Sequence, residues 1–199
     1  MIAGILAGVS QVLVGHPFDT LKVRIQNKKL HFNQLYSGWK SPMVSSIVVN
    51  GILFPIYENY RQHYSAFTSG AISGAFVTPI VFLFDTYKIQ MQMSQPLSFS
   101  FTGLPSTLAR EVLAFGIYFE SYEQCKNYTD SSLTSGAFAG LTNWFFTYPI
   151  DVVRSRQISQ KISIREALSQ RKLYSGISIC LLRAMLVNSA VFATYDFFK

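Results

Sequence analysis

The sequence has few charged residues and almost no cysteine for a chain of its length. Of its 199 residues, 14% are Asp, Glu, Lys or Arg, whereas an ordinary globular domain carries about 25%. A soluble surface needs more charge than this, so the shortage favours a membrane protein. Two cysteines are too few for a disulfide framework, and a hydrophobic content of 49% excludes a disordered chain.

The surplus of positive charge does not indicate a nucleic-acid partner. The net charge is +7, but the basic residues form no domain-wide patch and no zinc-ligand spacing is present. His16, His31 and His63 do not cluster, and no Ser-His-Asp order occurs. We therefore expect no enzyme, no metal site, no cofactor and no nucleic-acid polymer as a partner.

Long stretches of the chain contain no charged residue at all. They are 1–18, 41–57, 62–84, 89–109 and 131–150, with a shorter one at 184–195. Most approach the roughly 20 residues that a helix needs to cross about 30 Å of hydrocarbon. Ser, Thr, Asn, Gln and Gly recur within them, which suits helices that line a polar cavity. Core helices of a soluble protein are the alternative, but five or six of them would need more charge to cover them.

A threefold internal repeat is the strongest signal in the sequence. Asp19, Asp85 and Asp151 are spaced 66 residues apart. A basic residue follows each of them by three positions and a glycine precedes each by eleven; these are Lys22, Lys88 and Arg154, and Gly8, Gly74 and Gly140. Each of these glycines closes a small-xxx-small pair, which lets two helix backbones approach closely.

A second pattern fills the other half of each repeat. An aromatic-x-Gly triplet stands 21 residues before a Tyr-acid pair, and a basic residue closes the segment. The triplets begin at Tyr36, Phe101 and Tyr174, the pairs are Tyr57-Glu58, Tyr122-Glu123 and Tyr195-Asp196, and the closing bases are Arg61, Lys126 and Lys199. Each repeat therefore holds two helices.

These patterns predict an all-α membrane protein with six transmembrane helices in three pseudo-symmetric repeats around a central cavity. The repeats span 1–64, 65–129 and 130–199, and the helices lie near 2–26, 38–61, 66–92, 102–126, 131–157 and 174–199. Most basic residues lie where the two helices of a repeat are joined. Such a bias has the form of the positive-inside rule, which explains much of the +7.

The repeated acid-base pairs can form gates. An acidic and a basic residue three apart share one face of a helix, and an isolated pair of this kind is a common local ion pair. Arranged around a threefold axis, Asp19, Asp85 and Asp151 would reach the bases of neighbouring helices. Glu58, Glu123 and Asp196 would do the same with Arg61, Lys126 and Lys199 at the opposite face. Two rings that close in turn meet the needs of alternating access.

The residues at 17–24 and 149–156 each read Pro-x-acid-x-x-base-x-base, which resembles the signature of the mitochondrial carrier family. The resemblance implies a monomeric six-helix bundle of the mitochondrial inner membrane that exchanges small metabolites. Its basic loops would face the matrix and both termini the intermembrane space. By the same resemblance, Gln26 and Gln92 brace the matrix gate. Tyr57, Tyr122 and Tyr195 brace the cytoplasmic gate.

The sequence also departs from the family pattern. Leu83 stands where the second repeat should have proline, and Pro79 lies about one turn earlier, which displaces the kink. Only 163–170 has room for the short matrix helix of the family. The aromatic-x-Gly triplets carry Ser or Thr where the family has a basic residue. Because these features serve contact with cardiolipin, that lipid is expected as a partner with weakened motifs.

Three charges lie inside the predicted helices. Placing an arginine near the middle of a span costs at least about 2.5–3.5 kcal/mol, so function is the default explanation for Arg110 and Arg183. Arg110 and Arg183 each precede the tyrosine of a Tyr-acid pair by 12 residues, and Ser45, followed by Ser46, holds that position in the first repeat. The third interior charge is Glu111. By the resemblance, the level of Ser45, Arg110 and Arg183 is the one at which the family contacts its substrate.

The interior charges suggest a class of substrate. Two arginines at one level can hold a carboxylate or phosphate in forked hydrogen bonds, and Glu111 suits a cationic or zwitterionic group. In the family, an Arg-acid pair here resembles carriers of amino acids, ornithine and carnitine esters, so this class is predicted.

Several alternatives remain open. A nucleotide exchanger is the first, with Tyr118 or Phe115 stacking on a base, and a non-transporting membrane scaffold is the second. A buried ion pair with Glu120 or Glu123 would be a structural explanation for Arg110.

Overall fold

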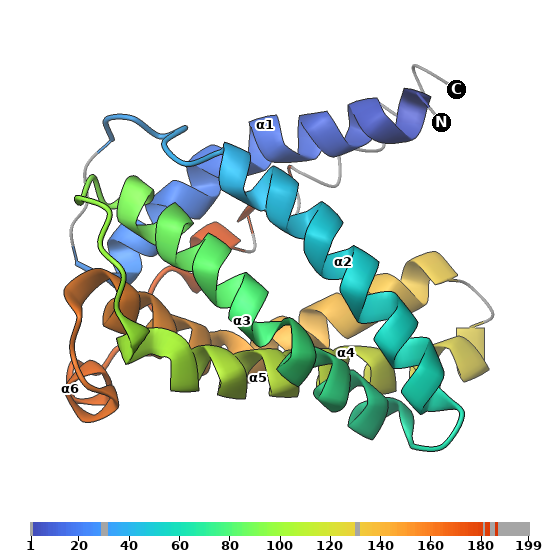
Figure 1. Ribbon diagram of the computed structural model, residues 1–199. Helices are drawn as coiled ribbons and strands as arrows, with labels where there is room; N and C mark the ends of the chain where they lie inside the picture. Colours follow the sequence, from blue (N-terminus) through green and yellow to red (C-terminus); the bar gives the residue numbers. More distant parts are fainter. Residues whose placement is uncertain (1, 29–31, 130–131, 181, 184–185, 187–199) are drawn as a thin grey trace.

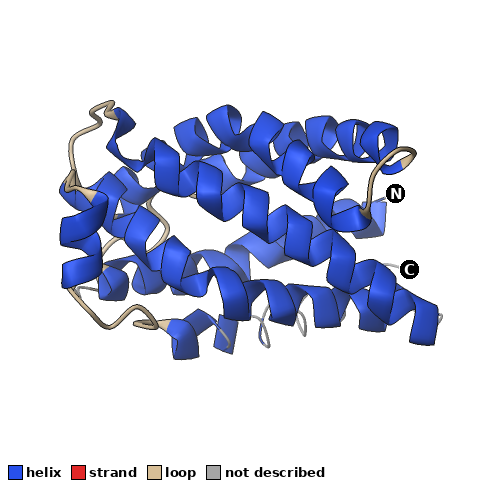
Figure 2. Cartoon of the chain, turned by 90° about the horizontal axis from the view of Figure 1, so that it is seen from below, coloured by secondary structure: helices blue, strands red, loops and turns tan. Residues whose placement is uncertain are grey.

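The computed structural model describes residues 2–28, 32–129, 132–180, 182, 183 and 186. Every regular element in this part of the chain is a helix (Figures 1 and 2). The long helices are α1 (Ile2–Gln26), α2 (Lys40–Arg61), α3 (Ala66–Gln92), α4 (Leu104–Thr129) and α5 (Ser132–Gln160). A short 3-10 turn, Phe101–Gly103, precedes α4, and the short helix α6 covers Ile164–Ser169. The predicted all-α class is confirmed for the described residues.

The helix boundaries follow the sequence prediction closely. The first five helices agree with the expected spans to within three residues at each end. The sixth expected span, 174–199, lies mostly outside the described residues, although 177–180, 182, 183 and 186 are helical. Helix α6 occupies the one segment that had room for a short matrix helix. It starts with a capping box in which Ser163 and Glu166 bind each other's backbone N–H groups.

The long helices run back and forth between two ends of the molecule. In Figure 1 the start of α1 and the connections α2–α3 and α4–α5 lie at the right, whereas the connections α1–α2, α3–α4 and α5–α6 lie at the left. Sequential helices are therefore antiparallel, as expected for helices joined by short connections. This alternation brings the three acid-base segments of α1, α3 and α5 to the same end.

Glycines allow α3 and α4 to pack at very short range. A Cβ atom added at Gly70 would lie 2.4 Å from the carbonyl oxygen of Phe115, and one at Gly74 would lie 2.5 Å from that of Glu111. Only residues without a side chain permit such an approach. Helix α3 also contains Pro79 within its unbroken span, and Leu83 points to the exterior.

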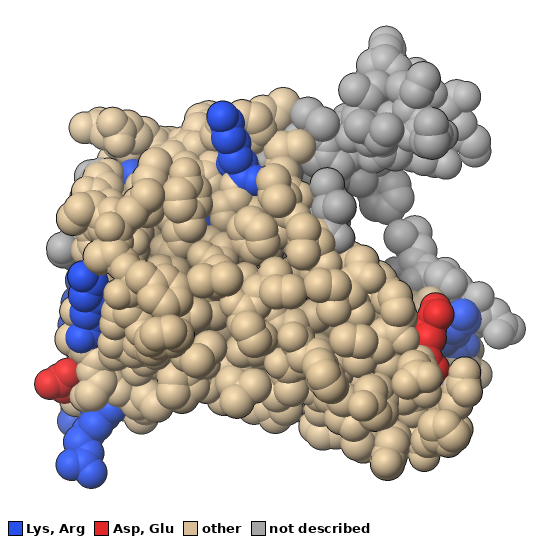
Figure 3. Space-filling view, viewed as in Figure 1, with Lys and Arg blue, Asp and Glu red and all other residues tan. Residues whose placement is uncertain are grey.

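The molecule is apolar outside and polar inside. Exposed side chains along the helices include Phe76, Leu141 and Phe145, whereas Arg24, Arg156 and other charged or amide side chains are fully buried. On the face drawn in Figure 3, charged side chains gather mainly toward the two ends and leave a largely uncharged band between them. A soluble protein has the opposite arrangement, so this distribution favours a lipid environment.

A test of length and composition singles out one of the described helices. By these criteria α3 is apolar enough to cross a membrane, and no other described helix is. A core helix of a soluble protein passes the same test. That the chain crosses the membrane six times therefore stays a prediction.

Equivalent contacts recur at equivalent positions of the sequence repeats. The residue before the signature proline donates a hydrogen bond to the middle carbonyl of the aromatic-x-Gly triplet. His16 Nε2 lies 2.9 Å from Ser37 O, and Tyr148 OH lies 3.0 Å from Ser175 O. The second repeat has Phe82 there, whose ring stacks near that of Phe101.

The glycines of these triplets rest on the next repeat in a cyclic order. Gly38 and Gly176 have φ values of +79° and +86°, which favour glycine. A Cβ atom added to them would lie 3.5 Å from Lys88 O and 3.6 Å from Lys22 O, respectively. The connection that contains Gly38 thus lies on α3 of the second repeat, and the segment that contains Gly176 lies on α1 of the first repeat. A closed arrangement of three units requires such contacts.

The short distance between α3 and α4 gives a direct test. In Gly70→Ala the new methyl group meets a backbone carbonyl that cannot move without shifting α4. We expect this overpacking to destabilise the protein by about 1–3 kcal/mol, measured as a lower melting temperature in detergent. Gly51→Ala is the matched control, because nothing lies within 4 Å of a Cβ atom there. Equal melting of the two variants would contradict the close contact.

Candidate functional site

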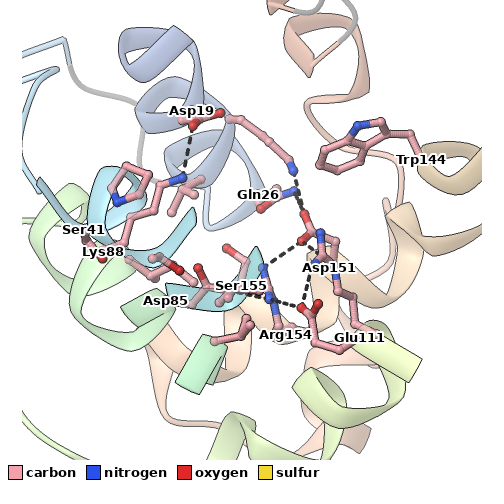
Figure 4. A pocket seen from close by; sticks show the side chains of 18 of the residues that line it. Asp19, Gln26, Ser41, Asp85, Lys88, Glu111, Trp144, Asp151, Arg154 and Ser155 are labelled. Atoms are coloured by element: carbon pink, nitrogen blue, oxygen red, sulfur yellow. Dashed lines mark hydrogen bonds and ion pairs between the residues drawn. The ribbon is translucent and has the colours of Figure 1, made fainter. Parts of the chain in front are cut away.

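A cavity of about 350 Å³ lies between the helices and is lined mainly by charged and polar side chains (Figure 4). It collects nine charged residues: Asp19, Lys22, Asp85, Lys88, Arg110, Glu111, Asp151, Arg154 and Arg183. Ser45 of α2 also lines it. The cavity therefore unites residues that the sequence analysis placed in the matrix gate and residues that it placed at the substrate contact level.

Three ion pairs between different helices close one end of this cavity. We call them the matrix ring, after the side on which the sequence resemblance would place them: Lys22–Asp151 at 2.7 Å, Lys88–Asp19 at 3.0 Å and Arg154–Asp85 at 2.6 Å. They join α1 to α5, α3 to α1 and α5 to α3. Each repeated aspartate thus reaches the base of a neighbouring helix, in the pattern that the 66-residue spacing predicts.

The matrix ring is largely shielded from solvent. The whole-residue exposure of Lys22 is 7% and that of Asp151 is 4%. Breaking a buried pair by removing one partner costs about 3–5 kcal/mol, because the other charge is left uncompensated. Asp151 also has a second partner, because Arg154 on the same helix binds it at 3.0 Å. The ring therefore fixes how α1, α3 and α5 stand relative to one another.

Of the two glutamines expected to brace the matrix ring, one contacts it. Gln26 Nε2 lies 3.3 Å from the Asp151 carboxylate, beside the Lys22 pair. Gln92 is buried, but its side-chain amide has no hydrogen-bond partner among the described residues. Only Gln26 is therefore placed as a brace in this structure.

Two buried arginines that the sequence analysis did not assign tie the repeats together. Arg24 Nε donates to the Gln92 carbonyl at 2.8 Å, and Arg156 Nε donates to the Gln26 carbonyl at 2.9 Å. These carbonyls end α3 and α1, where a cation is favoured by the helix dipole. The second repeat has Gln90 instead, which binds Ser98 of its own loop. Arg24 and Arg156 are the last basic residues of the Pro-x-acid-x-x-base-x-base segments, and this position was the sequence signal that could have indicated these bonds.

A layer of uncharged side chains joins α1 and α5 beyond the matrix ring. Asn27 Nδ2 lies 3.0 Å from Ser155 Oγ. Its oxygen accepts from the Ser159 hydroxyl and, at 3.2 Å, from the Gln160 amide. These bonds were not predicted, because short polar residues carry no distinctive spacing.

The proposed contact residues are themselves paired with the matrix ring. Arg110 forms an ion pair with Glu111 and its Nε lies 4.0 Å from Asp151 Oδ1. Arg183 Nε lies 2.7 Å from Asp19 Oδ1. Arg110, Arg183 and Ser45 share the cavity as expected, whereas the side chain of Ser46 lies outside the described residues.

The alternative explanation for Arg110, a pair with Glu120 or Glu123, is wrong. Glu120 accepts a hydrogen bond from the backbone N–H of Phe67 at 3.0 Å, and Glu123 binds Arg61. Both carboxylates lie several turns farther along α4. The partner of Arg110 is instead its neighbour Glu111, because both side chains line the same cavity.

At the opposite end of the bundle one predicted pair is described. Arg61 binds Glu123 in a fork, with N–O distances of 2.8 Å and 2.6 Å, and Tyr57 OH donates to the same carboxylate at 2.7 Å. Lys126 lies over the ring of Tyr122, 5.6 Å from its centroid, and Glu58 is exposed. Tyr195, Asp196 and Lys199 lie outside the described residues.

A helical bundle with an apolar exterior and a central charged cavity has the construction of a membrane transport protein. A family model described as "Mitochondrial carrier protein" matches residues 1–34 and 129–170. These residues hold two of the three acid-base segments of the matrix ring. The match supports the resemblance of this chain to the mitochondrial carrier family.

Curated relatives align along nearly the whole chain. A human mitochondrial basic amino acids transporter is 27% identical over 263 residues, which cover 97% of this chain and 87% of the relative. A mitochondrial arginine transporter of Arabidopsis thaliana is 24% identical, covering 98% and 88%. Human solute carrier family 25 member 45 is also 24% identical, covering 98% and 96%. Because these alignments exceed 199 positions, the relatives carry internal segments that this chain lacks.

The buried arginine at the end of α5 allows a test of how the repeats are joined. In Arg156→Lys a single ammonium group replaces a planar guanidinium that reaches the carbonyls of Gln26, Ala167 and Arg171. Leaving a buried carbonyl unsatisfied costs about 1–3 kcal/mol, so the melting temperature in detergent should fall. Arg165→Lys, at an exposed position of α6, should melt like the wild type. An unchanged Arg156→Lys would show that these bonds do not hold the repeats.

Proposed function

We propose that the chain is an alternating-access antiporter of the mitochondrial inner membrane that exchanges small metabolites of the amino-acid class. The observation that carries the proposal is the composition of the cavity. Two arginines and one buried glutamate face the same space, and a ring of three ion pairs closes one end of it. A site of this kind can bind a small zwitterion and exclude water on one side.

The charges in the cavity favour an amino acid over a nucleotide. Arg110 and Arg183 can hold the carboxylate in charge-assisted hydrogen bonds, while Glu111 can accept an ammonium or guanidinium group. Phosphates would also attract the arginines, but Asp19, Glu111 and Asp151 stand beside them and repel a polyanion. The names of two relatives, which cite basic amino acids and arginine, agree with this choice. A carnitine ester carries the same two charges and belongs to the same class of candidates.

The two ends of the bundle supply the gates. The matrix ring, with Gln26 beside it, would form the gate on the matrix side. Arg61, Glu123 and Tyr57 would belong to the cytoplasmic gate, together with Glu58, Lys126, Tyr122 and the equivalent residues 195, 196 and 199. Because the cavity lies within one chain, a monomer suffices for transport. Three repeats of two spans would put both termini on one side, which is the intermembrane space if the basic loops face the matrix. Anionic lipid such as cardiolipin would contact the loops.

A non-transporting scaffold is the weaker alternative. A scaffold needs helix packing but no charged cavity, and gathering nine charged residues there, four of them buried, is costly without a functional reason. The cavity charges are therefore better explained by a substrate.

Uptake by reconstituted liposomes tests the proposal. We expect exchange of a radiolabelled basic amino acid, inhibited by unlabelled amino acids or carnitine esters and not by nucleotides. Arg110→Ala and Arg183→Ala should each abolish exchange, whereas Arg165→Ala on α6 should retain it. Inhibition by nucleotides alone would overturn the substrate class, and unchanged uptake by both cavity variants would overturn the binding assignment.

The matrix gate can be tested by reversing one of its pairs. Asp151→Lys places two ammonium groups together and leaves Lys22 without its partner, so transport should be lost. Adding Lys22→Asp restores an ion pair across α1 and α5 and should recover part of the transport. Recovery with Lys40→Asp, which changes a base outside the ring, would show instead that overall charge matters.

A further inference from the structure

A second cavity, of about 640 Å³, lies at the end of the bundle where α1 ends and α6 follows α5 (Figure 1). We call it the basic pocket, because four basic residues line it: Lys28, Arg156, Arg171 and Lys172. It shares none of its described lining residues with the cavity of the proposed substrate site. The proposed transport therefore leaves these residues without a role.

The cations of the basic pocket have no acidic partner among the described residues. No carboxylate lines the pocket, and none of the four cations belongs to an ion pair of the described chain. The formal charge of the lining is therefore +4. Because like charges repel one another at short range, an anion bound among them would stabilise this end of the bundle.

Arg156 holds the backbone that carries two of the exposed cations. Its guanidinium is fully buried and donates to the carbonyl of Arg171 at 3.0 Å and to that of Lys172 at 3.4 Å. Its Nε binds the carbonyl of Gln26, two residues before Lys28. One buried side chain thus fixes the segment after α6 against the end of α1. The pocket is a built feature of the fold and not a chance meeting of long side chains.

Three of the four cations have a left-handed backbone. The φ values are +57° at Lys28, +49° at Arg171 and +52° at Lys172. Such values are uncommon for residues other than glycine, and they persist only where the surrounding structure holds them. Glycine would relieve the strain but would remove the charge. Cationic side chains at strained positions around one pocket therefore indicate that their charges are used.

The positive-inside rule explains the number of basic residues at this end but not their arrangement. A signal for orientation needs Lys and Arg in the connections between helices, at any position near the membrane. It needs neither a shared pocket nor a buried arginine that orients the backbone of its neighbours. The arrangement is better explained by a ligand.

The other lining residues favour a soluble anion over a lipid. They are Ser169, Gln170 and Ser175, so the described lining offers no apolar surface to an acyl chain and no aromatic ring to a nucleotide base. Arg171 can bind two phosphate oxygens in a fork, and the two lysines can add charge-assisted hydrogen bonds. The pocket therefore suits phosphate groups that are surrounded by water.

We propose that the basic pocket binds a water-soluble polyvalent phosphate, either inorganic or the phosphate chain of a metabolite. The anion binds Lys28 at the end of α1 together with Arg171 and Lys172 after α6, and so it joins the first repeat to the third. This inference goes beyond the proposed function and does not depend on it, because the two sites have no described residue in common.

Inorganic pyrophosphate is the probe for this site. At low ionic strength it should raise the melting temperature of the purified chain in detergent in a saturable way. The rise should be roughly 3–5 °C at about ten times the dissociation constant. Sodium chloride at the same ionic strength should give no comparable rise. A rise that chloride reproduces would show general screening of charge and would overturn the proposal.

Two variants test opposite sides of the pocket. Arg171→Gln combined with Lys172→Gln removes two cations and should weaken pyrophosphate binding by about tenfold or more. Glutamine suits this backbone, since Gln34 has a φ value of +51°. Lys28→Gln removes the cation on α1's side of the pocket and should also weaken binding, which keeps the proposal falsifiable if the double variant does not fold.

Lys161→Gln is the matched control. Lys161 is exposed, has a φ value of +54° and lies in the connection between α5 and α6, but it does not line the pocket. This variant should keep the full rise in melting temperature. Equal rises in the control and in both pocket variants, or no rise in the wild type, would overturn the proposal.

A lipid arm separates the two sources of a phosphate group. If phosphatidylglycerol added to the detergent raises the melting temperature through these residues and pyrophosphate does not, the pocket binds lipid headgroups and the proposal is wrong. Liposome uptake is scored separately. Exchange of amino acids without any effect of pyrophosphate would overturn this inference alone, whereas binding of pyrophosphate without exchange would overturn only the proposed function.

Discussion

The structure depends on the pairing of buried charges between helices. An unpaired charge inside a bundle surrounded by lipid is too costly to persist, so each aspartate of the ring must reach a base on another helix. This requirement fixes the rotation and depth of α1, α3 and α5 together, because a shift of any one helix breaks two pairs. The equal spacing of the three acid-base segments in the sequence reflects that requirement.

The short connections between helices must also be held in place at the end of the bundle where the ring lies. Relatives carry internal segments that this chain lacks, and here the loops are held by bonds from side chains to backbone. Ser37 Oγ donates to the Met91 carbonyl at 2.8 Å, while Arg24 and Arg156 bind the last carbonyls of α3 and α1. Single side chains thus join the repeats at this end of the bundle.

The sequence predicted what depends on repetition and missed what depends on individual packing. Helix bounds, the ring pairs and the shared cavity follow from spacing, because equivalent positions in equivalent helices must meet. The layer around Asn27 was not foreseen, since hydrogen bonds among short polar residues leave no pattern. The pair of Arg110 with Glu111 was not foreseen, and the open alternative of a pair with Glu120 or Glu123 is wrong, because adjacent residues of a helix do not usually face each other. They meet here because both point into one polar cavity.

The balance of charge within the cavity would allow the proposed exchanger to stay closed when it is empty. Its acids and bases already satisfy one another, so the closed state needs no bound counter-ion. Opening the ring without a ligand would separate these charges in a medium of low dielectric constant, which is unfavourable. A ligand that brings both signs of charge removes that penalty, because it supplies a partner for each group that it displaces. The same residues would then both select the substrate and prevent movement of the gate in its absence.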